Sequence, residues 1–191
     1  MNAVVTGIGL VSSIGNNCAE VLESLRGMRT GIAIHPELEA ADAPFQLAGV
    51  IRGFEFPSVQ PHTWSWPGDV KIPRTQLRSM PPHGVYAMIA LHEAIAQAGL
   101  SADDLRDPSV GMLTASAGST RLLHAHVTKM LEEGISQCHP FSITSSICGT
   151  LNYNLAAALG ITGLSGGCVS ACASSAQALG LALDQIRLGR Q

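Results

Sequence analysis

Residues 167–175 read Gly-Cys-Val-Ser-Ala-Cys-Ala-Ser-Ser and place Cys172 where a short strand, expected over Gly167–Ser170, turns directly into a helix expected over Ala173–Leu188. A sharp strand-to-helix turn tolerates only small neighbours and projects its central side chain outward, as in the nucleophile elbow. The positive end of the helix dipole stabilises a thiolate, and free backbone N–H groups there stabilise an oxyanion. Because free cysteine is also a common small buried side chain, spacing alone leaves both interpretations of Cys172 open.

Two other motifs carry weaker signals. Cys168 lies four residues before Cys172, but zinc needs about four ligands, and the neighbouring pair Cys138 and His139 has no second pair at finger-like spacing. Ordinary packing is therefore favoured over a metal site. The Gly7-Ile8-Gly9 motif lacks the third glycine and the acidic residue of a dinucleotide-binding loop, so a structural turn is favoured and no cofactor is expected.

No histidine lies in a convincing catalytic context. His124 and His126 are two residues apart on an expected helix, so their side chains point in different directions. The sequence thus contains a candidate nucleophile without an identifiable base.

Strands and helices alternate along the chain, which indicates an α/β layered fold. Asn17 and Glu20 form a capping box that opens a helix ending at Gly27, with Val21, Leu22 and Leu25 on one face. The expected elements are a strand at Ala3–Thr6, that helix, a proline- and tryptophan-rich irregular excursion over about 31–80 with a short strand near Leu47–Ile51, a helix from Pro81 and Pro82 to Gly99, a strand at Val110–Ala115, helices over about 120–133 and 143–159, then the strand and helix around Cys172.

Composition bounds the possible partners. The 191 residues suit one domain or half of a larger fold, and a net charge of −3 argues against nucleic acid or an anionic membrane as a partner. Charged residues make up only 13% of the chain, so much of its surface is expected to be covered by another subunit or another half of the fold.

The segment 134–183 contains no Asp, Glu, Lys or Arg. Polar residues and glycines interrupt it, so it is interpreted as a buried part of a globular fold rather than a membrane span, and the helix over Ala173–Leu188, apolar nearly all round, is expected to be buried. The N-terminus lacks the features of a signal peptide, and five cysteines form no disulfide framework, so a reducing cytoplasm is expected.

The chain resembles the β-ketoacyl-[acyl carrier protein] synthases, most nearly the bacterial type I enzymes. The resemblance rests on Val169–Ala176, on the later residues Leu179-Gly180 and Gln185–Gln191, and on the opening Val4–Asn17. Arg78-Ser79-Met80 and Val110-Gly111 agree more loosely. It covers residues 1–191 as a synthase N-terminal domain.

The resemblance implies a thiolase-like fold, of which this chain is the N-terminal half: a mixed sheet covered by helices and truncated before the second half. It implies a decarboxylative condensation of fatty-acid or polyketide synthesis, with Cys172 as the acylated nucleophile and its own N–H as half of the oxyanion hole. The implied partners are acyl carrier protein and a second copy, paired through Gly166–Ser170.

The family's two histidines and lysine belong to the second half, so the isolated chain is expected to be incomplete and inactive. A thiolase would lack the Ala-Cys-Ala-Ser-Ser context, and a chain-length-factor-like, non-catalytic subunit would normally lack the cysteine. A half-subunit complemented by a separate C-terminal chain stays open as an alternative.

Overall fold

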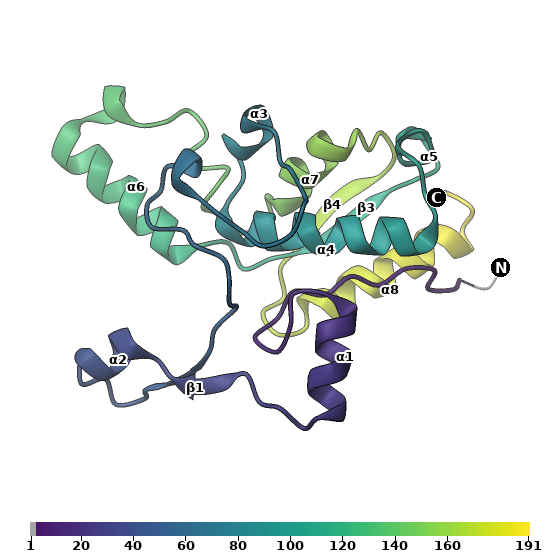
Figure 1. The fold of residues 1–191 in the computed structure, drawn as a ribbon. Helices are drawn as coiled ribbons and strands as arrows, with labels where there is room; N and C mark the ends of the chain where they lie inside the picture. Colours follow the sequence, from purple (N-terminus) through teal and green to yellow (C-terminus); the bar gives the residue numbers. More distant parts are fainter. Residues whose placement is uncertain (1–2) are drawn as a thin grey trace.

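The parallel strands β3 (Met112–Ala115) and β4 (Ser165–Cys168) lie between two helices, α7 (Leu151–Leu159) on one face and α8 (Ser174–Arg187) on the other (Figure 1). The computed structural model describes residues 3–191. Strands and helices alternate, so the predicted α/β class is confirmed. The elements in chain order are α1 (Cys18–Arg26), β1 (Ile32–Ile34), α2 (Pro36–Ala40), β2 (Leu47–Gly49), the 3₁₀ turn η1 (Pro61–Thr63), α3 (Arg74–Leu77), α4 (Pro82–Ala98), α5 (Ala102–Arg106), β3 (Met112–Ala115), α6 (Thr120–Glu133), the 3₁₀ turn η2 (Ile135–Gln137), α7 (Leu151–Leu159), β4 (Ser165–Cys168) and α8 (Ser174–Arg187).

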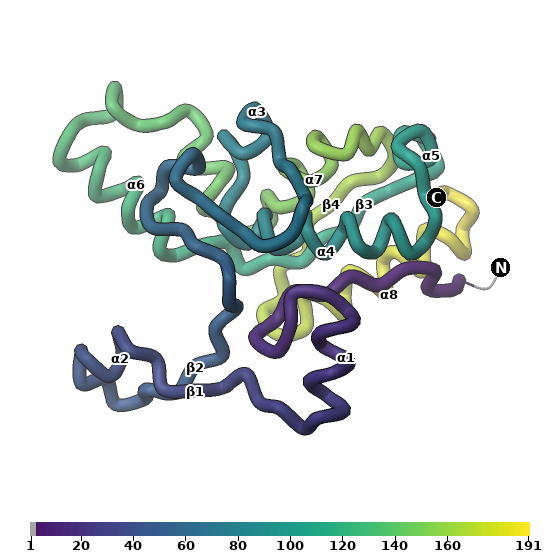
Figure 2. The backbone as a smooth tube through the Cα atoms, viewed as in Figure 1, coloured from purple at the N-terminus to yellow at the C-terminus, as the bar shows by residue number. Residues whose placement is uncertain are grey.

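Strand pairing is divided between two small sheets in the described chain. β3 and β4 pair in parallel, with Met112 opposite Ser165 and Ala115 opposite Cys168. A parallel pair needs a long crossover, which here contains α6 and α7. β1 and β2 form a separate antiparallel pair, and with α2 they extend away from the body of the molecule (Figure 2). Parallel and antiparallel pairing therefore both occur, but not in one continuous mixed sheet.

The helix ends follow the predicted caps. The Asn17 side chain accepts a hydrogen bond from the Glu20 N–H at 2.9 Å and opens α1, which stops before Gly27. The Glu20 carboxylate accepts from the Asn16 N–H at 2.8 Å rather than from the Asn17 N–H, so the predicted capping box forms only in part. α4 begins at Pro82 and ends where Gly99 adopts a left-handed φ of 69°. α6 occupies the predicted range 120–133. These boundaries depend on neighbouring residues, so the sequence contains the information that sets them.

The main core lies between the N-terminal half of α4 and α7. It contains Val85, Met88 and Ile89 from α4 and Leu151 and Leu155 from α7. The irregular excursion over 31–80 adds the remaining buried side chains of this cluster: Trp64, Ile72, Leu77 and Met80. The excursion is therefore part of the core as well as of the surface.

Four expected elements differ in the structure. Residues 3–6 form no strand, since no described segment pairs with their backbone. The helix expected from 143 begins only at Leu151, because the hydroxyls of Ser145, Ser146 and Thr150 bond to nearby carbonyl groups and favour turns. The predicted strands at Val110–Ala115 and Gly167–Ser170 are each displaced by about two residues at one end or both.

The predicted burial of α8 is also wrong for this chain. In α8 only Ser174 and Ala178 are buried, and Leu179 is 71% exposed. In α1, Leu22 and Leu25 are exposed and Val21 is buried. A single small sheet covers one side of a helix, so an apolar surface that surrounds α8 remains largely open to solvent.

Residues 7–10 lie along α4, where two glycines allow close approach and two α4 side chains accept hydrogen bonds from the segment. Ile8 N–H donates to Gln97 at 2.6 Å, and Leu10 N–H donates to Glu93 at 3.0 Å. A Cβ atom at Gly7 would lie 2.1 Å from the Ala94 carbonyl oxygen. The Gly-x-Gly motif thus permits close approach of two backbones, rather than forming the turn that was expected.

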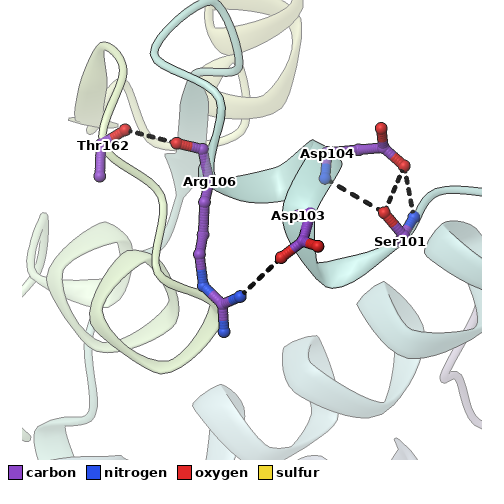
Figure 3. Close-up of polar contacts among 5 residues, drawn as sticks. All are labelled: Ser101, Asp103, Asp104, Arg106 and Thr162. Atoms are coloured by element: carbon purple, nitrogen blue, oxygen red, sulfur yellow. Dashed lines mark hydrogen bonds and ion pairs between the residues drawn. The ribbon is translucent and has the colours of Figure 1, made fainter.

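α5 anchors the loop that leads into β4 (Figure 3). Ser101 and Asp104 form a capping box, in which the Ser101 hydroxyl accepts from the Asp104 N–H and the Asp104 carboxylate accepts from Ser101. These hydrogen bonds lower the pKa of Asp104. Arg106 pairs with Asp103 at 3.0 Å, and its carbonyl accepts from the Thr162 hydroxyl at 2.9 Å. The start of the loop is therefore tied to a capped helix.

Among residues 3–191 no helix combines the length and apolarity that crossing a membrane requires.

Gly9 and Gly180 provide a matched pair of alanine substitutions. A Cβ at Gly9 would lie 1.7 Å from the Ala90 carbonyl oxygen, whereas one at Gly180, exposed on α8, meets nothing within 4 Å. We expect Gly9→Ala to lower the free energy of unfolding by about 1–3 kcal/mol through overpacking. Gly180→Ala should raise it by about 0.5–1 kcal/mol, because alanine loses less backbone entropy in a helix.

Urea unfolding followed by circular dichroism measures both changes. Equal stabilities of the two variants would contradict the close contact between the N-terminal segment and α4.

Candidate functional site

Cys172 occupies the turn between β4 and α8. β4 ends at Cys168, α8 begins at Ser174, and the Cys172 side chain is exposed. Its immediate neighbours Ala171 and Ala173 carry only methyl groups. The strand–turn–helix arrangement predicted around Cys172 is therefore present, with the strand ending earlier than expected.

The backbone of this turn is strained. Ala171 has a φ of 48°, in the left-handed region that costs a residue with a Cβ atom about 1–2 kcal/mol. The Ser174 hydroxyl accepts from the Ser170 N–H at 2.7 Å and donates to the Ala171 carbonyl at 2.7 Å. The Ala173 N–H donates to the Ser170 carbonyl at 3.0 Å. Hydrogen bonds on both sides of Ala171 thus compensate for its conformation and present Cys172 to solvent.

The start of α8 supplies the electrostatics of the site. α8 is 14 residues long and its N-terminus, the positive end of its dipole, lies next to Cys172. Among residues 3–191, the thiols of Cys18 and Cys138 form hydrogen bonds. The Cys172 thiol forms none within this part of the chain. An exposed sulfur at the start of a helix can attack the carbonyl carbon of an incoming substrate.

The remaining cysteines occupy different environments. Cys168 is buried in β4, and Cys148 is exposed in the loop before α7. Within the described residues no group of three or more His, Cys, Asp and Glu side chains is placed to hold a metal ion. The side chain of Cys18 lies beside Glu93, and the pKa of its thiol is raised by burial and by that carboxylate. Among these side chains, Cys148 is an exposed thiol comparable with Cys172.

The histidines His124 and His126 point in different directions, as predicted from their spacing. His124 is exposed, whereas His126 lies 3.4 Å from the Ser145 hydroxyl. Burial lowers the pKa of His126, and the electrostatic effects of His139 and Lys129 lower it further. These groups do not form hydrogen bonds with Cys172.

His126 belongs to a cationic cavity of about 600 Å³ that the sequence did not predict. Arg74, Arg78 and Lys129 line it, and no Asp or Glu does. Lys129 is also 3.7 Å from Glu133 on the same helix. The lining comes from residues 59–80, 122–129 and 137–145, segments that only the fold brings together.

Comparison with known proteins gives one consistent family. Residues 2–191 match the model of the β-ketoacyl synthase N-terminal domain. The chain is 33% identical over 198 residues to 3-oxoacyl-[acyl-carrier-protein] synthase 1 of Escherichia coli K12 and 32% identical over 190 residues to the Haemophilus influenzae protein of the same name. These alignments cover 99% and 98% of this chain and 44% of each relative, so the chain spans less than half of their length.

Solved structures show the same fold. A β-ketoacyl synthase from Burkholderia phymatum superimposes with a TM-score of 0.75 at 24% identity, covering 98% of this chain and 44% of that one. A type II PKS ketosynthase complex with its acyl-carrier protein gives a TM-score of 0.70 at 19% identity, covering 98% and 47%. The thiolase-like fold expected from the sequence, and the family resemblance itself, are confirmed.

The environment of His126 predicts a pH dependence. In the unfolded chain His126 has its ordinary pKa of 6.5 and binds a proton as the pH falls through that value. In the folded chain its pKa is lower, so the imidazole stays neutral over part of the same pH range. The free energy of unfolding should therefore fall as the pH drops through about 6.5. Burial lowers the pKa of His83 in the same direction, so resolving His126 requires a residue-specific measurement.

Titration of each histidine by NMR provides that measurement. Lys129→Gln removes a neighbouring positive charge and should raise the pKa of His126. Lys71→Gln, which lies outside the cavity, serves as the control and should leave it unchanged. An unaltered His126 titration in Lys129→Gln would refute the electrostatic coupling.

Proposed function

The chain belongs to the β-ketoacyl synthase family, and we propose that it supplies the nucleophile, Cys172, of a decarboxylative condensation in fatty-acid or polyketide synthesis. The observation that carries the proposal is the exposed Cys172 thiol in a strained turn at the start of α8. The five cysteines of the chain are free, which suits the reducing cytoplasm that we propose as its compartment.

The first half of the proposed reaction is acyl transfer. The Cys172 thiolate attacks the carbonyl carbon of an acyl thioester on the carrier protein, and the new C–S bond forms a tetrahedral oxyanion. The Cys172 N–H is proposed as one of the donors that stabilise this oxyanion. When the intermediate collapses, the carrier thiolate leaves and takes up a proton, and the acyl group remains on Cys172.

The second half is condensation. A malonyl group on a carrier protein loses CO₂, and the electron pair of the broken C–C bond forms a carbanion. The carbanion attacks the acyl-Cys172 carbonyl, and the Cys172 thiolate leaves. The product is a 3-oxoacyl thioester, and the cysteine is regenerated.

The condensation step needs groups that the described residues do not bring to Cys172. An enolate requires positioned hydrogen-bond donors, and none of the histidine hydrogen bonds in residues 3–191 reaches this side chain. We therefore propose that a complementary C-terminal half supplies them and that this chain by itself does not condense acyl groups. A non-catalytic, chain-length-factor-like role is less well supported, because the cysteine is present.

The proposed partner is acyl carrier protein. The curated relatives carry acyl-carrier-protein in their names, and one structural neighbour is a ketosynthase in complex with such a carrier. Identity to that neighbour is low, so its complex supports the proposal only by similarity of fold.

A second copy of the chain is proposed to pair through residues Gly166–Ser170. β4 pairs with β3 along one edge, and its other edge has no partner strand among residues 3–191. Val169, the residue after β4, is 51% exposed, and Ser165 and Gly167 of the strand itself are exposed. An isologous contact would cover part of the uncharged segment 134–183.

Acyl transfer to a single cysteine tests the proposed function. After incubation with an acyl-carrier thioester, mass spectrometry of the digested chain should place the acyl group on Cys172. Cys172→Ser should lower the rate at least about a hundredfold, because a hydroxyl is a poor nucleophile without a dedicated base. Cys148→Ser removes another exposed thiol and should retain the wild-type rate.

Two results would count against the proposal. Equal acylation of Cys18, Cys138 and Cys172 would remove the special role of the turn. Release of CO₂ from malonyl-carrier protein by this chain alone at about 1–10³ per second, the usual range for enzymes, would disprove the need for a complementary half.

Val169→Asp tests the proposed pairing. A charge at the centre of the interface should shift the chain from dimer to monomer or aggregate in sedimentation velocity. Met28→Asp, at a side chain 92% exposed in another part of the chain, is the control and should leave the dimer intact. A Val169→Asp variant that remains dimeric would place the interface elsewhere.

A further inference from the structure

We infer that Ser174 is a positioning residue for Cys172: its hydroxyl holds the turn that presents the thiol. The inference rests on the proposed role of Cys172 as nucleophile, and it extends that role to the group that sets the geometry of the cysteine. Ser174 lies in the first turn of α8, two residues after Cys172, and its side chain is buried.

The Ser174 hydroxyl uses both its hydrogen-bonding functions on the turn. Its oxygen accepts from the Ser170 N–H at 2.7 Å, and its proton is donated to the Ala171 carbonyl at 2.7 Å. The Ser174 N–H also donates to the Ala171 carbonyl at 3.2 Å. One side chain therefore connects the Val169–Ser170 peptide group with the Ala171–Cys172 peptide group.

This connection matters because, apart from the Ser174 hydroxyl, the turn is held mainly by two backbone hydrogen bonds, from the Ala173 N–H to the Ser170 carbonyl and from the Ser174 N–H to the Ala171 carbonyl. Ala171 has a positive φ of 48°, which alanine adopts only when its surroundings enforce it. The side chains on either side of Cys172 are methyl groups, and Val169, Ser170 and Cys172 are exposed, so packing contributes little. Loss of the Ser174 hydroxyl would leave Ala171 free to relax toward a negative φ, which redirects the Cα–Cβ bond of Cys172.

Gln177 provides a second, weaker tie. Its side chain accepts a hydrogen bond from the Ser170 hydroxyl, one helical turn into α8. Gln177 therefore contacts the turn at one side-chain atom, whereas Ser174 contacts two backbone groups. The effects of removing the two side chains should follow that order.

The reactivity of Cys172 with iodoacetamide, measured against Cys148 in the same chain, tests the inference. Cys148 is an exposed thiol outside the turn, so it reports any general change in folding or accessibility. In Ser174→Ala, we expect the rate constant for Cys172 relative to Cys148 to fall about tenfold. Ser174→Thr keeps a hydroxyl on the same carbon and should restore most of the ratio, and Gln177→Ala should lower it about threefold or less.

Ser175→Ala is the matched control, since Ser175 is the next residue of α8, is exposed and forms no side-chain hydrogen bond among those found in residues 3–191. It should retain the wild-type ratio. Thermal unfolding of each variant identifies any that fail to fold. If Ser174→Ala fails to fold, the Cys172-to-Cys148 ratio is compared between Ser174→Thr and Ser174→Cys instead. The cysteine variant has a side chain of similar size, but its thiol donates and accepts hydrogen bonds only weakly.

The outcomes separate the positioning role from the nucleophile role. A wild-type Cys172 that reacts faster than Cys148, with the same ratio in Ser174→Ala, would overturn the positioning role and leave the proposed function intact. Equal slowing of Cys172 and Cys148, or no recovery in Ser174→Thr, would show a merely structural role. A wild-type Cys172 no faster than Cys148 would count against the proposed function and, with it, against the positioning role.

Discussion

The parallel pairing of β3 with β4 is the constraint on which the rest of the structure depends. It joins residues 112–115 to residues 165–168 across the crossover, and it determines where the chain emerges toward Cys172. Beyond the end of β3, the loop that contains Ser119 meets the loop that contains Ser146. The Ser119 N–H donates to the Ser146 carbonyl at 2.8 Å. A slip of one residue would exchange the faces of β4, so the register is under strong steric control.

Glycine allows the loop 146–149 to pack closely beside this pair. A Cβ atom at Gly167 would lie 2.4 Å from the Gly149 carbonyl oxygen, and one at Gly118, where φ is 76°, would lie 2.6 Å from the Cys148 nitrogen. The loops on both sides of the pair therefore pack backbone against backbone. This close packing explains why the elements around Cys172 contain small residues, and it connects the local composition of the chain with the exposure of its candidate nucleophile.

Burial is distributed unevenly around this sheet. The α7 face connects to the main core of α4 and the 54–80 region, whereas the α8 face leaves Leu179 and Leu181 exposed. An apolar surface of this extent is unfavourable in water and is typical of a face that another chain or segment covers. This exposed apolar surface is consistent with the low charge content of the sequence. It is also consistent with relatives that are more than twice the length of this chain.

The amino-acid sequence by itself determined the features that depend on near neighbours. Asn17 with Glu20 set the start of α1, Gly99 set the end of α4, and the small residues around Cys172 indicated the turn, because caps and tight turns are decided within a few residues. Tertiary structure alone decided the lack of a strand at residues 3–6, the exposure of α8, the cationic cavity around His126 and the two hydrogen bonds of Ser174. Each of these depends on which distant segment lies opposite, and in a folded chain that is settled by packing and backbone pairing across the whole domain, which no local pattern of residues encodes.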